Sequence, residues 1–190
     1  MEASGLVVID LLEDFFDGSL WPESPLPGRR VELVGAVNRV VKTFRASGRP
    51  VIWVRQGFKA DLSDAFPHMR KSGRAYTIEG TPGAEFLKEL DIREGDPVVT
   101  KKRFSAFYGT DLEEVLKNLL VRRVFLAGIT TSWCVRSTAV DAYQRDFEVV
   151  LLEACLGGFS EWDHERDLQA MDGYIGTVIL RSKAEGRIEN

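Results

Sequence analysis

Hydrophobic residues are concentrated in six short runs along the chain, and most of these runs are continuously apolar instead of alternating with polar residues. A continuous apolar run of strand length is typical of a strand that is covered on both faces, as in a parallel sheet. The predicted strands are residues 6–11, 51–55, 97–101, 124–129, 149–153 and 177–180.

Several segments between these runs repeat apolar residues at helical spacing. Residues 133–144 follow this pattern, and so do residues 31–45, whose stripe consists of Val34, Val37, Val41 and Phe44. A capping box of Thr110 and Glu113 predicts a further helix that runs to about residue 120. Strands joined by helices predict an α/β protein: a three-layer α/β/α sandwich with a six-stranded parallel sheet, Rossmann-like in arrangement.

The length and composition of the chain indicate how many domains it forms. The chain has 190 residues, of which 44% are hydrophobic and 28% charged, so we expect a single domain over residues 1–190. Residues 183–190 are polar and are predicted to be a loose tail. Residues 56–81 are irregular and long for a connection, which favours a loop or lid on the substrate side.

Charge narrows the range of partners. A formal net charge of -4 and a pI of about 5.4 argue against nucleic acid, and no apolar run is long enough to cross a membrane. The N-terminus lacks the features of a signal peptide, so we expect a cytoplasmic protein. The chain's two cysteines, Cys134 and Cys155, are consistent with a reducing compartment.

Three reactive residues follow the ends of predicted strands. Asp10 lies near the end of the first strand, Lys101 ends the third, and Cys134 follows the fourth at the start of a helix. If the strand order reverses between the first and fourth strands, Asp10 and Cys134 face each other across the crevice where ligands bind. A helix start favours a thiolate, so Cys134 is the candidate nucleophile. Each residue alone has a structural interpretation, and Cys155 is interpreted as a buried apolar residue.

The chain resembles the isochorismatase-like cysteine hydrolases, a family that includes nicotinamidases and isochorismatase. The matching blocks are VVID at 7–10 with DF at 14–15, KKRFSAF at 101–107 with GTDL at 109–112, and GITTSWC at 128–134 with STA at 137–139. Any one block would be weak evidence, but together and in this order they are specific.

The resemblance implies a mechanism for these residues. It makes Cys134 the nucleophile, Asp10 its base and Lys101 the cation that positions the pair, with Lys102 as the rival if the strand register differs by one residue. It also implies an oxyanion hole formed by the backbone N–H groups of Thr130 and Cys134, a cis peptide before Thr130, and a homo-oligomer, either dimer or tetramer.

The predicted function is hydrolysis of a C–N bond in a small amide or carbamoyl compound through a thioester. No cofactor and no metal are expected, because the region after the second strand lacks the metal ligands of nicotinamidases, and His68 and His164 lie in separate segments. Alternatives are isochorismatase-type vinyl ether hydrolysis and a binding or redox-sensing module on the same fold. The candidates for lining the substrate pocket are Phe15, Arg55, Phe107 and Trp133.

Overall fold

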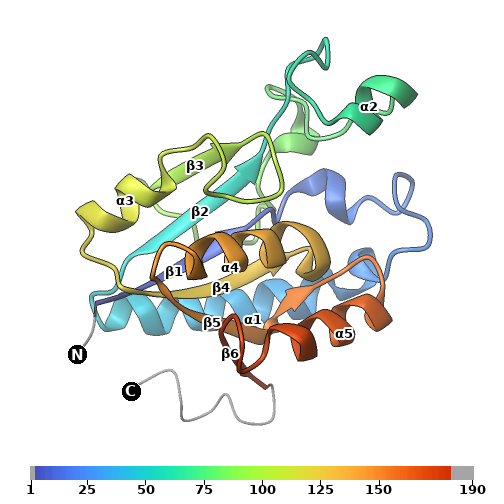
Figure 1. Ribbon diagram of the computed structural model, residues 1–190. Coiled ribbons are helices and arrows are strands. Elements are labelled where there is room, and N and C mark those ends of the chain that lie inside the picture. The colour runs from blue at the N-terminus through green and yellow to red at the C-terminus, as the bar shows by residue number, and fades with distance from the viewer. Residues whose placement is uncertain (1–2, 181–190) are drawn as a thin grey trace.

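A computed structural model describes residues 3–180, and its centre is a six-stranded sheet in which every neighbouring pair is parallel (Figure 1). The strand order is β3-β2-β1-β4-β5-β6. This arrangement confirms the predicted α/β fold, and each of the six predicted runs forms a strand of the sheet. The strands are β1 (Ser4–Ile9), β2 (Val51–Gln56), β3 (Val98–Lys101), β4 (Arg123–Ile129), β5 (Glu148–Gly157) and β6 (Thr177–Ile179).

The apolar runs are continuous because the sheet is covered on both sides. Along β1, Leu6 and Val8 pack into one hydrophobic cluster, while Val7 and Ile9 pack into the other. Alternate side chains of a strand point to opposite faces, so a strand buried on both faces needs apolar residues at successive positions.

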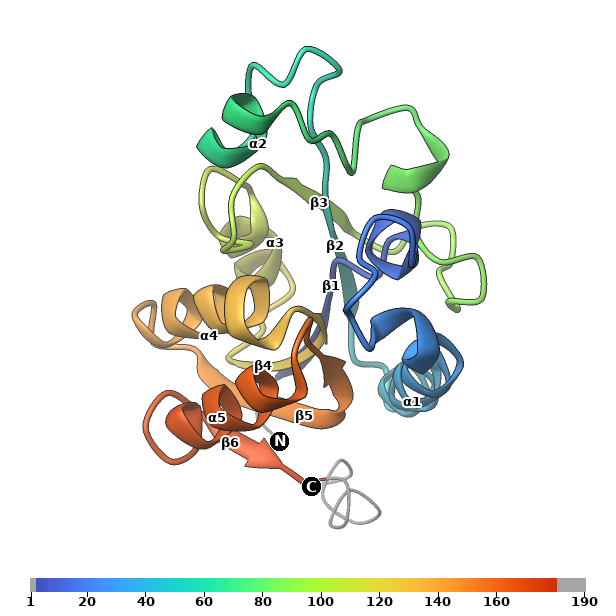
Figure 2. The same ribbon diagram turned by 90° about the vertical axis from the view of Figure 1, so that its right-hand side faces the viewer.

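Helices form the two outer layers. Helix α1 (Leu26–Ala46) lies on one face, and α3 (Leu112–Asn118), α4 (Arg136–Tyr143) and α5 (Glu161–Met171) lie on the other (Figure 2). A shorter helix, α2 (Pro67–Ser72), lies beyond the sheet in the irregular region between β2 and β3. None of the helices within residues 3–180 combines the length and apolar character needed to cross a membrane.

Two helix starts differ from the sequence-based expectation. Helix α1 begins five residues before Val31, with a proline in its first turn, a position where the missing proline N–H costs nothing. The capping box at Thr110 is not formed: the Thr110 hydroxyl accepts from the backbone N–H of Leu112, but Glu113 pairs with Lys117 and Arg145 instead of reaching back. Helix α3 therefore begins at Leu112.

The strand order reverses between β1 and β4, which are neighbours in the middle of the sheet. Their close approach depends on Gly128, whose φ is +110° and where an added Cβ would lie 2.0 Å from the carbonyl oxygen of Ile9. Such a contact and such a φ are both open to glycine alone. The chain leaving β1 and the chain leaving β4 therefore meet at the carboxyl edge of the sheet, the usual ligand-binding position in this architecture.

Candidate active site

Asp10 is the first residue beyond β1. Its φ is +56°, in the left-handed region, and its backbone N–H donates to the carbonyl of Val54 at 2.8 Å. Aspartate tolerates this conformation better than most residues. The turn directs a carboxylate that is 1% exposed into the crevice between β1 and β4.

Cys134 lies on a short π-helical turn, Thr131–Val135, between β4 and α4. The peptide bond between Ile129 and Thr130, where the chain leaves β4, is cis. Thr138 holds the turn in place: its hydroxyl donates to the carbonyl of Cys134 at 2.7 Å and accepts from the N–H of Ala106 at 2.9 Å. The nucleophile candidate is thereby fixed to both α4 and the loop that follows β3.

Lys101 joins these two residues. Its Nζ lies 2.7 Å from Asp10 Oδ2, 3.2 Å from Cys134 Sγ and 3.1 Å from the carbonyl oxygen of Arg103. An ammonium group has three N–H donors, so these three acceptors account for all of them. Lys102 points elsewhere and pairs with Asp64 and Glu79. The structure therefore brings Asp10, Lys101 and Cys134 together and leaves Lys102 outside.

Burial controls the proton on Cys134. Loss of hydration is the largest effect and, together with the charge of Asp10, it outweighs the opposing effect of Lys101, so the pKa of the thiol is raised to about 12. Burial also acts to lower the pKa of Lys101, but the charges of Asp10 and Cys134 reverse this effect, so its pKa is raised. Burial therefore opposes the thiolate that the helix start favours: Asp10 and Lys101 already balance each other, and a thiolate would add an unbalanced buried charge.

Thr130 presents a free backbone donor beside the thiol. Among the described residues, no group accepts a hydrogen bond from its backbone N–H, although Thr130 is 5% exposed and lines the cavity described below. Buried backbone N–H groups are nearly always paired, so an unpaired one facing a cavity is suited to bind a ligand oxygen. An unpaired backbone donor beside the thiol is one of the components that an oxyanion hole needs.

A cavity of about 480 Å³ opens above Asp10, Thr130 and Cys134. Most of its surface is apolar and consists of aromatic rings, which we call the aromatic wall: Phe15, Trp21, Phe66, Tyr76, Phe104, Trp133 and Phe159. The rings contact one another, for example Trp21 with Phe159 at 4.4 Å and Phe66 with Phe104 at 4.5 Å between centroids. A cavity of this size and character suits a small planar molecule.

Two of the four predicted pocket residues, Phe15 and Trp133, line this cavity, and the other two do not. Arg55 points to the opposite side of β2, where its Nε donates to the Thr100 hydroxyl at 3.3 Å. Phe107 is buried in the helical layer, 5.9 Å from the ring of Phe147. The assignment of Arg55 and Phe107 to the pocket is therefore corrected, because the direction of a side chain depends on strand register and loop path.

The sequence analysis missed several lining residues. Gln56, Phe66, His68 and Tyr76 come from the end of β2 and the segment after it, and Trp21 comes from the loop before α1. One signal was available: aromatic residues recur in the otherwise polar and irregular stretch between β2 and β3. Such rings in a long loop indicate a loop that packs against something, here the cavity.

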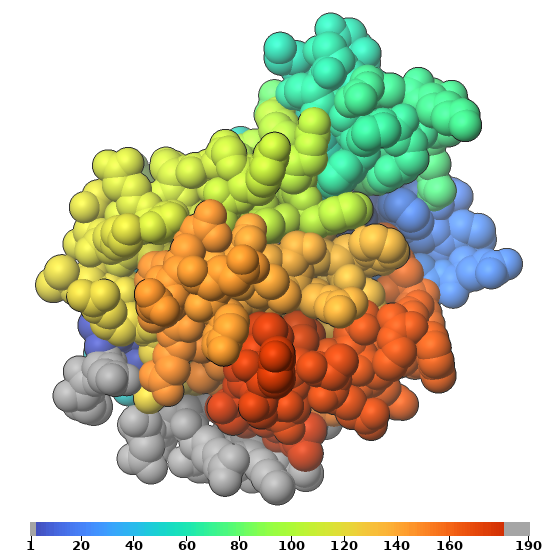
Figure 3. All heavy atoms as spheres, in the orientation of Figure 1, coloured from blue at the N-terminus to red at the C-terminus, as the bar shows by residue number. Residues whose placement is uncertain are grey.

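The segment 57–81, which we call the lid, is anchored at both sides of the cavity. Lys102, just after β3, contacts Asp64 at 3.0 Å and Glu79 at 2.6 Å, and Asp14 accepts from the N–H of Thr77 at 2.6 Å. In the space-filling view the lid, in teal and green, projects from the body beside the blue N-terminal segment (Figure 3). The expectation of a substrate-side loop agrees with this position.

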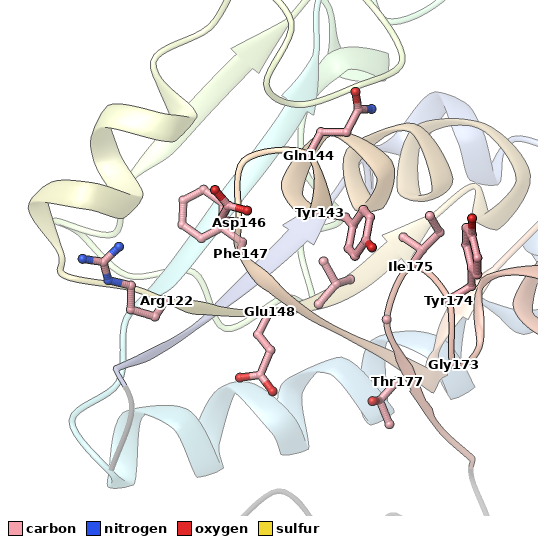
Figure 4. Close-up of a pocket in the computed structure, with 12 residues that line it drawn as sticks. Arg122, Tyr143, Gln144, Asp146, Phe147, Glu148, Gly173, Tyr174, Ile175 and Thr177 are labelled. Atoms are coloured by element: carbon pink, nitrogen blue, oxygen red, sulfur yellow. The ribbon is translucent and has the colours of Figure 1, made fainter.

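A wider hollow of about 1000 Å³ lies at the opposite edge of the sheet (Figure 4). Its residues come from the starts of β5 and β6, the residue before β4 and the end of α4, and they include Arg122, Tyr143, Asp146 and Tyr174. It contains no cysteine and none of the three reactive residues. The chemistry therefore belongs to the smaller cavity.

Cys155 lies within β5 and is 2% exposed. Burial raises the pKa of its thiol to about 12, and it packs into the hydrophobic cluster beneath α1. Its position agrees with the structural interpretation made from the sequence.

Comparison with known proteins decides the family. Residues 4–183 match the family model described as an isochorismatase domain. The chain belongs to the isochorismatase family. Maleamate amidohydrolase from Pseudomonas putida is 32% identical over 181 residues, which are 92% of this chain and 83% of that relative.

Solved structures of the isochorismatase family agree in fold. N-carbamoylsarcosine amidase from Thermoplasma acidophilum superimposes with a TM-score of 0.75 at 31% identity, covering 92% of this chain and 94% of that one. Pyrazinamidase of Pyrococcus horikoshii, solved in complex with zinc, gives a TM-score of 0.79 at 30% identity, covering 93% and 98%.

The zinc in that relative raises the question of whether this chain has suitable ligands. Within residues 3–180, no three His, Cys, Asp or Glu side chains are grouped so that they could hold a metal ion. The histidine in the cavity, His68, lies 3.2 Å from the Tyr76 hydroxyl, and Asp10 is paired with Lys101. These residues do not fit a zinc site of that kind, so the chemistry derived below uses the chain's own side chains.

Proposed function

We propose that this protein is a cysteine hydrolase that cleaves the C–N bond of a small amide or carbamoyl compound through a thioester. The observation that carries the proposal is the contact of Lys101 Nζ with both Asp10 Oδ2, at 2.7 Å, and Cys134 Sγ, at 3.2 Å, at the base of the aromatic cavity. A nucleophile, a base and an orienting cation in mutual contact form the basic unit of covalent catalysis.

The first step transfers the thiol proton to Asp10 as Cys134 Sγ bonds to the carbonyl carbon of the substrate. The carbonyl π electrons move to oxygen, and the backbone N–H groups of Thr130 and Cys134 stabilise the resulting oxyanion. Because the thiol begins protonated, proton transfer and attack are coupled, and no free thiolate accumulates. Lys101 keeps its charge and holds both partners in place.

The second step breaks the C–N bond. Asp10 returns its proton to the departing nitrogen, ammonia or an amine leaves, and the acyl group remains on Cys134 as a thioester. Asp10 then accepts a proton from water as the water oxygen attacks the thioester carbon, and the proton passes to the sulfur when the C–S bond breaks. The acid product leaves, and Asp10 and Cys134 regain their original protonation.

The named relatives support this reaction, since maleamate amidohydrolase and N-carbamoylsarcosine amidase both cleave amide-type bonds by their names. Vinyl ether hydrolysis, the alternative within this family, retains the acid and the lysine but does not need the thiol. The direct contact of Cys134 with Lys101 therefore favours the amide reaction.

The test is ammonia release from a panel of small amides, ureas and carbamoyl amino acids. We expect release by the wild type, an acyl adduct on Cys134 in intact-mass spectra, and background rates for Cys134→Ala. The matched control, Cys155→Ala, should keep its activity because Cys155 lies in the core away from the cavity. Undiminished ammonia release by Cys134→Ala would contradict the thioester mechanism. If the wild type released no ammonia from any compound of the panel, a binding or redox-sensing module would be favoured.

We also propose that the enzyme is a homo-oligomer, a dimer or a tetramer. Two large exposed aromatic side chains support this: Trp133, beside the nucleophile, is 54% exposed, and Tyr108, between β3 and α3, is 66% exposed. Exposed aromatic side chains are enriched at protein interfaces.

A further inference from the structure

His164 is a buried histidine that the proposed reaction does not use. It lies on α5, it is 6% exposed, and it does not line the aromatic cavity. Burial and the charge of Arg29 lower the pKa of its imidazole, so the ring is neutral at neutral pH. Buried polar side chains in proteins are nearly always paired, so the partner of this ring indicates what it does.

The partner is Thr131, the first residue of the turn that carries the nucleophile. His164 Nδ1 lies 2.7 Å from the Thr131 hydroxyl oxygen, which lies 3.1 Å from the carbonyl oxygen of Gly157. A carbonyl oxygen can only accept, so the single hydroxyl proton of Thr131 goes to Gly157. The hydroxyl oxygen then accepts from His164 Nδ1–H. This assignment satisfies all three groups and makes His164 a donor.

The contact joins three elements behind the active site. Gly157 is the last residue of β5 and pairs in register with Ile129, the last residue of β4. His164 comes from α5, and the fully buried Thr131 stands between them. The Thr131 side chain therefore ties the beginning of the turn to both the sheet and the outer helical layer.

The two ends of this turn have different anchors. At the end that carries Cys134, the thiol contacts Lys101 and the backbone carbonyl accepts from the Thr138 hydroxyl. At the other end lies Thr130, whose backbone N–H faces the cavity without a partner within residues 3–180. The residue next to Thr130 is Thr131. The direction of the free N–H therefore depends on the Thr131 anchor, whereas the thiol has its own.

We propose that His164 is a positioning residue that acts through Thr131 to aim the backbone N–H of Thr130 at the oxygen of the tetrahedral intermediate. This inference rests on the proposed function for the attack of Cys134 on a carbonyl carbon. It goes further, because it assigns a role to a pair of residues outside the cavity. Its consequence is specific: without His164, stabilisation of the oxyanion is weakened while the reactivity of the thiol remains.

The test uses benzaldehyde as a probe, so that it does not depend on turnover. In a Cys155→Ala parent, the sulfur of Cys134 bonds to the aldehyde carbon, the carbonyl π electrons move to oxygen, and the thiol proton ends on that oxygen. The affinity is measured as protection of Cys134 from iodoacetamide. Benzyl alcohol is the matched probe, because it fills similar space but cannot add to sulfur.

Substitutions at His164 test the donor. His164→Leu should bind benzaldehyde roughly tenfold more weakly, while benzyl alcohol affinity and the alkylation rate of the free protein stay within about twofold of the parent. His164→Asn keeps an N–H donor near the position of Nδ1 and should restore most of the benzaldehyde affinity. The control, Glu165→Gln, alters the next, exposed residue of α5 and should change nothing.

Thr131 supplies an independent variant. Thr131→Val keeps the shape of the side chain but removes the hydroxyl, so it should lose as much benzaldehyde affinity as His164→Leu. The double variant should be no weaker than either single one, because both changes break the same contact. With an amide that the parent hydrolyses, each single variant should lower kcat by roughly a hundredfold and leave KM within about threefold.

Three results would overturn the proposal: unchanged benzaldehyde affinity in both His164→Leu and Thr131→Val, equal losses of aldehyde affinity, alcohol affinity and alkylation rate, or no benzaldehyde adduct on the parent. Equal losses would mean that the contact only supports the general structure. Failure of the proposed function looks different. In that case the parent releases no ammonia from any amide of the panel, while the pattern of aldehyde affinities still holds.

Discussion

At the scale of single residues, the site depends on a balance between the charges of Asp10 and Lys101. Asp10 and Lys101 cancel each other inside the protein, and Cys134 is tolerated there because it is neutral. Asp10 therefore has two opposing effects: it accepts the thiol proton during the reaction, yet its charge keeps that proton on sulfur at rest. These two effects can be separated by substitution.

Asp10→Asn should lower the pKa of Cys134 and at the same time slow hydrolysis. Without the carboxylate, Lys101 loses its counter-ion and favours the thiolate, so alkylation by iodoacetamide at neutral pH should accelerate, roughly tenfold for each unit by which the pKa of Cys134 falls. Hydrolysis should drop by at least roughly a hundredfold, because the proton acceptor and donor is lost. In the wild type, alkylation should keep rising as the pH increases from neutral towards the raised pKa of Cys134.

Both rates are best measured in a Cys155→Ala background, which leaves Cys134 as the sole thiol. Asp17→Asn is the matched control, since Asp17 is exposed in the loop after Asp10 and should affect neither rate. Slower alkylation of Asp10→Asn than of the wild type would contradict this account of the charge balance.

At the scale of elements, the junction of β1 and β4 determines whether the site can form. Gly128→Ala places a methyl group 2.0 Å from the Ile9 carbonyl oxygen, at a φ of +110° that alanine resists. We expect a loss of more than about 2 kcal/mol in the free energy of unfolding, measured by urea denaturation.

Gly35→Ala is the control for this substitution. Gly35 lies inside helix α1, and an added methyl group would meet the end of the flexible Arg39 side chain at 3.6 Å. Alanine is the better helix former, so this variant should be more stable by up to about 1 kcal/mol. Equal stability of Gly128→Ala and the wild type would mean that the strands can separate without cost.

The elements also show how far the sequence could lead. The strands were predictable because burial on both faces leaves an unbroken apolar run, and Asp10, Lys101 and Cys134 could be placed because each follows such a run. Arg55 was chosen as a pocket residue where its neighbour Gln56 lines the cavity, since alternation makes a one-residue difference decisive. The path of the lid, which brings Phe66 and Tyr76 to the wall, depends on tertiary contacts that no local pattern records.

At the scale of the whole molecule, the cavity opens beside aromatic surface that one chain leaves uncovered. Light scattering coupled to gel filtration should give a mass that is a multiple of the 21.3 kDa chain. Trp133→Arg should shift the mass towards that of one chain, because the half-exposed ring is replaced by a charge. The control is Trp162→Arg, which alters a more exposed ring on α5, away from the cavity. A monomeric wild type with full activity would rule out the assembly.

The order of the sheet also divides the active site between two stretches of chain. Strands β1 to β3 and helix α3 come before Leu120, an exposed residue in the turn that leads to β4. A chain cut in this turn would carry Asp10 and Lys101 on one fragment and Cys134 on the other. Neither piece holds a complete set of reacting groups, so hydrolysis by a mixture of the two would be a direct signal that β1 and β4 have found each other. The rate of hydrolysis would then report how much of the two fragments has assembled into the native sheet.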